Sequence, residues 1–272
     1  MSAVRVAVIG HVEWVQHARL REPLERGAIV QLHDTFEEPA GGGGVAARAL
    51  PSLGAESRFY TALGNDAAAE ASERLLRADG CELRVARRAN PQARVTPLAE
   101  PSGERTILLH GANDHPEIED PLGWDELAEF DGVFYTGDDP RTVVAARRAP
   151  ILVATARRLA SVVVSRVQVD VLAASARDRG ERYDLADLPV RPRLCVWSEG
   201  ADGGRYLAED GSAGRWEAAP APGRIVDTYG AGDVFMAALT LELARGAQRD
   251  EALARAAQAG AAQLTRRGGG PP

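Results

Sequence analysis

The sequence contains no lysine, so all 32 of its basic residues are arginine. This absence excludes a Schiff-base lysine and a complete Walker A motif, because both need a lysine side chain. Cysteine is nearly absent as well: Cys81 and Cys195 lie far apart in the chain. A disulfide framework is therefore not expected, and a reducing cytoplasmic location fits this composition.

Long apolar runs are also missing. No stretch of 18 apolar residues occurs, so no transmembrane helix is expected, and the apolar part of the N-terminus is too short for a signal peptide. The formal net charge of −7 argues against non-specific binding to nucleic acid or to an anionic membrane. The length of 272 residues, 45% of them hydrophobic, predicts one α/β domain over residues 1–272.

Short apolar segments alternate with helical segments through much of the chain. The run VRVAVIG predicts a buried first strand at 4–10. Further strands are expected at 56–63, 132–137, 149–155, 169–175 and 192–200, and helices at 66–80, 141–148, 156–166, 231–245 and 250–266. Strands that alternate with helices favour a mostly parallel sheet with helices on both faces.

Two early regions depart from this alternation. Residues 27–40 have alternating polarity, and 93–100 and 104–110 flank the turn signal PSG, which is typical of a hairpin. We therefore expect a small appended antiparallel sheet with strands within about 12–40 and 92–112. The glycine run 41–44 is expected to form a loop before a helix that Pro51 ends early, and the closing GGGPP looks disordered.

The stretch VDTYGAGDVFMAAL, residues 226–239, places a glycine turn and an acid at the start of an apolar helix. A tight turn with an ordinary helix cap explains this pattern. An anion site is the alternative explanation, because the amides of a glycine-rich turn and of a helix N-terminus point at the same place. A phosphate would suit such a site. Asp233 would then lie near it, where a carboxylate can accept a proton from a hydroxyl.

The motif DTYGAGD at 227–233 resembles the C-terminal signature of the ribokinase-like carbohydrate kinases, also called the PfkB family. The resemblance extends over nearly the whole chain. It includes the opening strand VAVIGHVE at 6–13, and then PAGGGGVAARALPSLGA, YTALGNDAAAEASERLLRADG, PSGERTILLHGAN and VWSEGADGG, in the order that the family has. It implies a three-layer α/β/α core with a small antiparallel β-sheet lid.

The family transfers the γ-phosphate of ATP, with Mg²⁺, to an alcohol of a sugar, nucleoside or related molecule. By resemblance Asp233 is the catalytic base, and Gly230, Ala231 and Gly232 form the anion hole. Ser198, Gly200, Gly203 and Thr228 are expected beside the nucleotide, with Glu13, Gly41, Gly42, Gly43, Arg105 and Asn113 near the acceptor. Asp227 matches a position that helps to hold a monovalent cation, such as K⁺, in some members. Turn capping, loop flexibility and surface exposure remain alternative explanations for several of these residues.

The sequence departs from the family pattern at three places. Val15 stands where many members have an aspartate that binds sugar hydroxyls, and Val45 and Ala46 stand near a usual asparagine. The usual Asn-x-x-Glu corresponds to residues 175–178, so that Asp178 could keep the acidic role near Mg²⁺. These changes suggest an active kinase with an atypical acceptor.

The sequence favours two other functions less. A catalytically weak relative could bind a small molecule and act as a regulatory protein, although the intact DTYGAGD motif argues against this. A dinucleotide-dependent enzyme would need a G-x-G-x-x-G after the first strand, and IGHVEW does not supply one. The apolar residues in IVQLHDTF and the segment EWV suggest a homodimer formed through the lid.

Overall fold

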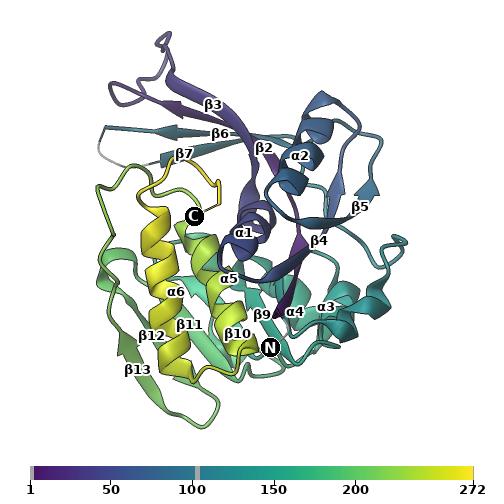
Figure 1. The fold of residues 1–272 in the computed structure, drawn as a ribbon. Coiled ribbons are helices and arrows are strands. Elements are labelled where there is room, and N and C mark those ends of the chain that lie inside the picture. The colour runs from purple at the N-terminus through teal and green to yellow at the C-terminus, as the bar shows by residue number, and fades with distance from the viewer. Residues whose placement is uncertain (1–2, 102–104, 272) are drawn as a thin grey trace.

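The computed structural model describes residues 3–101 and 105–271. Its large sheet has the strand order β13-β12-β11-β10-β9-β8-β1-β4-β5 (Figure 1). Strands β11, β12 and β13 pair antiparallel, and the other neighbours in this sheet run parallel. The strands are β1 Arg5–Gly10, β4 Glu56–Leu63, β5 Glu82–Arg87, β8 Gly132–Thr136, β9 Ile151–Thr155, β10 Val171–Ser175, β11 Leu194–Ser198, β12 Gly204–Ala208 and β13 Ala213–Trp216.

Successive side chains of the central strands enter two separate cores. In β1, Val6 and Val8 belong to one buried cluster, whereas Ala7 and Ile9 belong to the other. This is the period of two that a strand imposes, and a strand buried on both faces reads as a continuous apolar run. The apolar run at 4–10 is therefore a strand buried on both faces, as the sequence predicted.

Helices cover both faces of the large sheet (Figure 1). The first core packs beneath α1 Gly41–Ser52, α2 Ala67–Ala78, α5 Ala231–Ala244 and α6 Arg249–Gln263. The second core lies beneath α3 Pro140–Ala146, α4 Leu159–Ser165 and the short helix η1 Trp124–Glu129. Asp66 caps α2 as predicted, because its side chain accepts a hydrogen bond from the Ala69 amide (3.0 Å).

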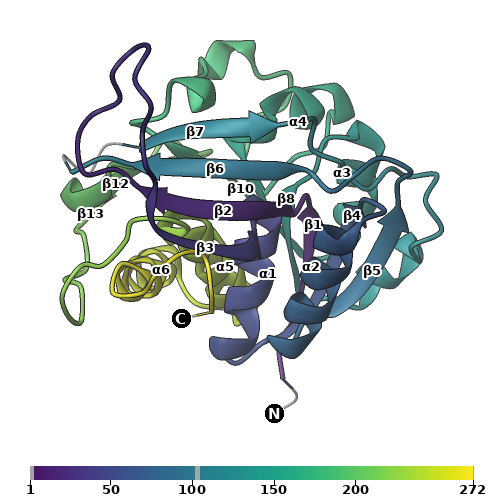
Figure 2. The ribbon, with the colours of Figure 1, turned by 90° about the horizontal axis from the view of Figure 1, so that it is seen from above.

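A second sheet lies across the top of the molecule, in the order β3-β2-β6-β7 (Figure 2). Its strands are β2 Glu13–Arg19, β3 His33–Ala40, β6 Arg94–Ala99 and β7 Arg105–His110. The outer pairs are antiparallel, while β2 and β6 run parallel. The predicted fold class is confirmed: a mostly parallel sheet lies between helix layers, with a small, largely antiparallel sheet beside it. Residues 102–104, in the predicted hairpin turn, lie outside the described residues.

Three local expectations from the sequence are wrong. The strand expected at 27–40 begins only at His33, after a segment in which the Ile29 side chain is fully exposed. The glycine run 41–44 is the first turn of α1 instead of a loop, and Pro51 lies in the last turn of that helix. The tail is ordered as far as residue 271, with Gly268 and Gly269 buried.

The tail is ordered because its backbone amides bind buried carboxylates. The Gly268 amide donates to Asp227 Oδ2 (3.2 Å), and the Gly269 amide donates to Glu38 Oε1 (2.6 Å). Gly269 has no room for a side chain, since a Cβ there would lie 2.6 Å from Val45 Cγ2. A glycine-rich composition suggested disorder, but here glycine permits close packing.

Candidate active site

The carboxyl ends of β1, β8, β9, β10 and β11 meet the N-terminus of α5 at a cavity of about 510 Å³. Ligands bind at this edge in open parallel sheets, because the loops that follow the strands diverge there. Nine of the residues expected at the site line this cavity: Glu13, Gly41, Gly42, Arg105, Asn113, Ser198, Gly230, Gly232 and Asp233. The others, which are Gly43, Ala231, Gly200, Gly203, Thr228, Asp227 and Asp178, do not line it.

The N-terminus of α5 opens into the cavity without a side-chain cap. Gly230 precedes the helix with a φ of 76°, and no side chain bonds the first amides. The left-handed φ favours glycine, and a Cβ at Gly230 would lie 3.0 Å from Val45 Cγ1. The free amides and the positive end of the helix dipole therefore face the space beside Gly232, where a Cβ would meet no atom within 4 Å.

Asp233 lies in the first turn of α5, at the wall of the cavity. Burial raises the pKa of Asp233 to about 7, and the nearby Glu181 and Glu13 carboxylates act in the same direction. A carboxyl group with a pKa near neutrality can take up and release a proton at physiological pH. Arg157 opposes the shift by favouring the charged form.

The first turn of α1 approaches Asp233 and Glu13 so closely that side chains there would have to displace their neighbours. A Cβ at Gly42 would lie 3.2 Å from Asp233 Oδ1 and 3.5 Å from Thr136 Oγ1. Gly41 has a φ of 79°, and a Cβ there would lie 3.1 Å from Glu13 Oε2. At Gly43 a Cβ would lie 2.6 Å from the His11 carbonyl oxygen. The glycine run thus brings helix backbone beside the two carboxylates of the cavity.

Glu13 begins β2 and Asn113 follows β7, at the same end of the second sheet, and their side chains meet in the cavity. Asn113 Nδ2 donates to Glu13 Oε1 (2.6 Å), and His11 Nε2 lies 3.6 Å from the same oxygen. Burial raises the pKa of Glu13, although the Asn113 bond favours its charged form. Val15, two residues along β2, is fully buried in the core and lies away from the cavity.

Arg105 on β7 connects the second sheet to the DTYGAGD segment. Its Nη2 donates to Asp227 Oδ1 (2.6 Å) and to Thr228 Oγ1 (3.1 Å), and its guanidinium lies over the Tyr229 ring. Burial disfavours ionisation of Asp227, but the Tyr229 amide and Arg105 outweigh it and lower the pKa of Asp227. Asp227 therefore binds a guanidinium at the position predicted to bind a monovalent cation.

Of the residues predicted near the nucleotide on β11 and in the turn after it, one lines the cavity and two do not. Ser198 ends β11 and lines the cavity. Gly200 begins the short helix η5 Gly200–Asp202 and is exposed. A Cβ at Gly203 would lie 2.8 Å from the Ala218 amide, so its glycine is explained by packing against the chain after β13.

The acidic side chain that reaches the cavity after β10 is Glu181 instead of Asp178. Asp178 caps the short helix η3 Arg179–Glu181 and pairs with Arg157. Glu181, at the end of that helix, lines the cavity and accepts a hydrogen bond from the Ser175 amide (2.6 Å). The expected spacing of three residues from Ser175 hid Glu181, because the chain makes an extra turn before it returns to the cavity.

Sequence reasoning also missed Arg157 and Arg158, which follow β9 and line the cavity. The sequence pattern assigns them to an ordinary helix, and its only signal of another role is a pair of arginines directly after a buried strand. Among the residues that the model describes, no group of three or more His, Cys, Asp or Glu side chains is arranged to hold a metal ion. In the same residues, no helix has the length and apolarity to span a bilayer.

Several solved structures of sugar and nucleoside kinases superpose on this chain. The model superposes on a ribokinase from Arabidopsis thaliana complexed with ribose and ATP at a TM-score of 0.77, with 17% identity, covering 99% of this chain and 96% of that one. It matches adenosine kinase from Sinorhizobium meliloti at 0.79, with 18% identity over 99% and 96% of the chains. Phosphofructokinase-2 from Escherichia coli in complex with potassium gives 0.74, with 17% identity over 98% and 94%. These likenesses define the ribokinase fold.

The sequence itself identifies the family. Residues 4–189 and 188–272 match the model of the pfkB family of carbohydrate kinases, and the chain belongs to this family. No curated protein sequence gives a significant match.

Proposed function

We propose that this protein is an ATP-dependent kinase that transfers the γ-phosphate to a hydroxyl of a sugar, polyol or nucleoside-like small molecule. Family membership supports a phosphotransferase of this class. The observation that carries the proposal is the position of Asp233, which combines a pKa of about 7 with uncapped helix amides beside it in one cavity.

In the proposed reaction the acceptor hydroxyl oxygen attacks the γ-phosphorus of ATP. Asp233 takes the hydroxyl proton, the bond to the bridging oxygen breaks, and ADP leaves with that oxygen. The amides of Gly230, Ala231 and Gly232 would stabilise the negative charge on the transferred group, because they are fixed before it arrives. We call the region around these amides and Ser198 the phosphate end of the cavity.

The acceptor end comprises Glu13, Asn113 and the first turn of α1, on the other side of Asp233. Glu13 can accept hydrogen bonds from acceptor hydroxyls, and the Asn113 carbonyl oxygen is a further acceptor. Ile107 and Leu109, at alternate positions of β7, add an apolar wall from the second sheet. This combination of carboxylate, amide and apolar surface suits a hydroxylated ring or chain.

The Arabidopsis thaliana ribokinase with this fold is complexed with ATP, which supports ATP as the phosphate donor here. Mg²⁺ usually binds nucleotide phosphates with one or two protein carboxylates and water, so a dedicated cage of side chains is not needed. Glu181 fits this requirement, because it is the carboxylate of the β10–β11 connection that reaches the cavity. Bound there with ATP, Mg²⁺ would neutralise phosphate charge.

Exchange of Asp233 for Asn tests the proposal. A positioned general base contributes about 10²- to 10⁴-fold, so Asp233→Asn should lose that much turnover while ATP still binds. The measurement is ADP formation across a panel of sugars, polyols, sugar phosphates and nucleosides, with ATP binding followed by calorimetry. Ligand binding without ADP formation across the whole panel would instead favour the regulatory binding protein.

A further inference from the structure

Three arginines line the cavity without a part in the proposed reaction, and one of them, Arg105, is paired with Asp227; the other two are Arg157 and Arg158. Both follow β9 directly and line the same cavity as Asp233 and Glu13. Arg157 has two carboxylate partners, since it pairs with Asp178 and lies 3.3 Å from Glu181 Oε1. Its charge is therefore largely compensated.

Arg158 lacks such compensation. Its nearest carboxylate oxygen, Asp138 Oδ1, is 3.4 Å away on a side chain that is 61% exposed, whereas the Arg158 side chain is only 18% exposed. A pair with a solvent-exposed partner contributes little. Burial lowers the pKa of Arg158, whereas the other arginines with a resolved shift in the described ranges have raised pKa values.

The shortest contact of Arg158 is with a neutral group. Its Nη2 lies 2.8 Å from His115 Nε2, and the His11 and His115 ring centroids are 4.9 Å apart. Burial, together with the charge of Arg158, lowers the pKa of His11 to about 3, and burial also lowers that of His115. Neither imidazole therefore adds charge at neutral pH.

The bond to Arg158 also fixes the tautomer of His115. A guanidinium can only donate, so Nε2 of the neutral ring must accept and Nδ1 must carry the proton. Within residues 3–101 and 105–271, His115 Nδ1 and Arg158 Nε have no hydrogen-bond partner. Both of these atoms are buried, so the group that can bind a ligand is the guanidinium of Arg158. It lines the cavity with an under-compensated positive charge, which is the complement of an anion.

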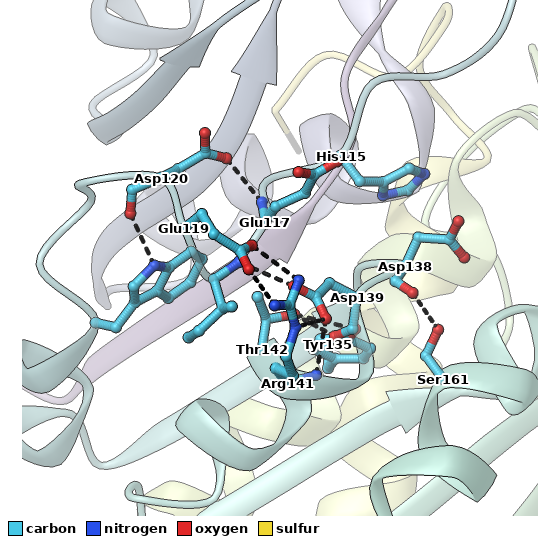
Figure 3. A network of polar contacts seen from close by, with 12 residues as sticks. His115, Glu117, Glu119, Asp120, Tyr135, Asp138, Asp139, Arg141, Thr142 and Ser161 are labelled. Atoms are coloured by element: carbon cyan, nitrogen blue, oxygen red, sulfur yellow. Dashed lines mark hydrogen bonds and ion pairs between the residues drawn. The ribbon is translucent and has the colours of Figure 1, made fainter.

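Two members of this cluster, His11 and Arg158, line the cavity, whereas His115 contacts Arg158 from outside the lining. The segment that carries His115 is anchored by Asp120, which accepts from the Glu117 amide (2.7 Å), and by Asp139, which accepts from the Ile118 amide (2.9 Å). Figure 3 shows His115 on this segment, close to the turn that carries Asp138 and Asp139. Glu13 is near enough to Arg158 for each to influence the ionisation of the other. Glu13 nevertheless makes its hydrogen bond to Asn113, so the carboxylate bonded to the guanidinium is the exposed Asp138 alone among the described residues.

We propose that the acceptor is a hydroxylated small molecule that also carries an anionic group, a carboxylate or a phosphate, which Arg158 binds beside His11 and His115. This inference rests on the proposed kinase function and names its substrate class. Charge-assisted bonds from arginine to a carboxylate or phosphate are among the strongest in proteins and are geometrically selective. The anion would neutralise the positive charge of Arg158, which the exposed Asp138 carboxylate compensates only weakly.

The experiment compares matched neutral and anionic acceptors. An aldonic acid is paired with its alditol to test a carboxylate, and a hexose 6-phosphate is paired with the free hexose to test a phosphate. The wild type should use one anionic member with a kcat/KM at least tenfold above its neutral partner. Because a hydrogen bond to a charged group is lost, Arg158→Gln should lower kcat/KM for that compound by about ten- to a hundredfold, and less than threefold for its neutral partner.

Three controls separate this role from a structural one. Arg158→Lys keeps the charge and should recover part of the preference, and Arg182→Gln removes an exposed arginine and should change neither rate. Thermal stabilisation by the same four compounds gives a readout that needs no turnover, and Arg158→Gln should abolish stabilisation by the anionic compound alone.

The outcomes distinguish the two proposals. Equal use of neutral and anionic acceptors, or an equal loss on both in Arg158→Gln, overturns the anionic acceptor and leaves the kinase intact. If no compound yields ADP, the kinase proposal fails, and selective stabilisation of the wild type by an anionic compound then decides whether Arg158 forms an anion site. The absence of such stabilisation, together with the absence of turnover, overturns this inference as well.

Discussion

At the phosphate end of the cavity the groups that face the ligand belong mainly to the backbone, whereas at the acceptor end they are side chains from separate segments. Gly230 and Gly232 flank free amides at a helix N-terminus. Glu13, Asn113 and Arg158 come from β2, the chain after β7 and the turn after β9. A backbone site depends on local conformation, so a short motif can encode it. A side-chain site depends on how distant segments pack. Substitutions in it can therefore alter which acceptor binds without disturbing the groups that carry out phosphate transfer.

The largest effect should come from the pH, because Asp233 lies between the two ends. Its pKa is raised to about 7, so the carboxyl is protonated below that pH and cannot act as a base. For the free enzyme, kcat/KM should fall about tenfold for each pH unit below 7, or about a hundredfold at pH 5. Steady-state measurement of kcat/KM with a confirmed acceptor from pH 5 to 8 tests this fall. A kcat/KM that stays constant over that range would contradict it.

A side chain at Gly42 should damage catalysis more than binding. The added Cβ would lie 3.2 Å from Asp233 Oδ1 and would displace the base by a few tenths of an ångström. A misplaced catalytic group costs up to about a hundredfold, so Gly42→Ala should lower kcat by about ten- to a hundredfold with little change in the KM for ATP. Gly223→Ala, at an exposed glycine whose nearest atom would be 3.7 Å away, is the matched control. An unchanged kcat in Gly42→Ala would show that the close approach has no catalytic role.

The C-terminal tail offers a test of whether close packing of its glycine backbone stabilises the protein. In Gly269→Ala the new Cβ would lie 2.6 Å from Val45 Cγ2, and overpacking of this kind costs about 1–3 kcal/mol. Denaturant unfolding should show this loss, and it should be absent in Gly270→Ala, where the nearest atom would be 3.5 Å away. Equal stability of the two variants would argue against the docked tail.

The smallest effect is expected at Arg105, which joins the two ends. The ion pair with Asp227 is partly exposed, so Arg105→Ala should reduce kcat/KM only about three- to tenfold. The variant also frees Asp227 Oδ1 for a cation. We therefore expect K⁺ to activate Arg105→Ala more than the wild type, measured as the ratio of rates in potassium and in a bulky organic cation. A wild type that responds as strongly would mean that K⁺ binds without displacing Arg105.

The sequence predicted the layered fold and the position of Asp233 because both follow from local patterns. Apolar runs at 4–10 and 132–137 indicate buried strands, and a glycine turn before an apolar run indicates the helix start at 230–231, where we propose the anion site. Glu181 was missed because its place depends on an extra turn after β10, and Arg158 was missed because pairing in the sheet, not sequence spacing, brings it beside His115. The ordered tail was hidden for the same reason, since its partners Glu38 and Asp227 lie far away in the chain.

The bond between the Gly269 amide and Glu38 spans 231 residues, which gives it a consequence for how the chain is made. On the ribosome β3 emerges early, and its buried carboxylate must wait for nearly the whole of the chain before this contact can form. Contacts of such long range form late and slowly. A nascent chain can therefore complete much of its large sheet while β3 and the Asp227 turn still lack the tail between them, and catalytic competence would be acquired at the last stage of folding.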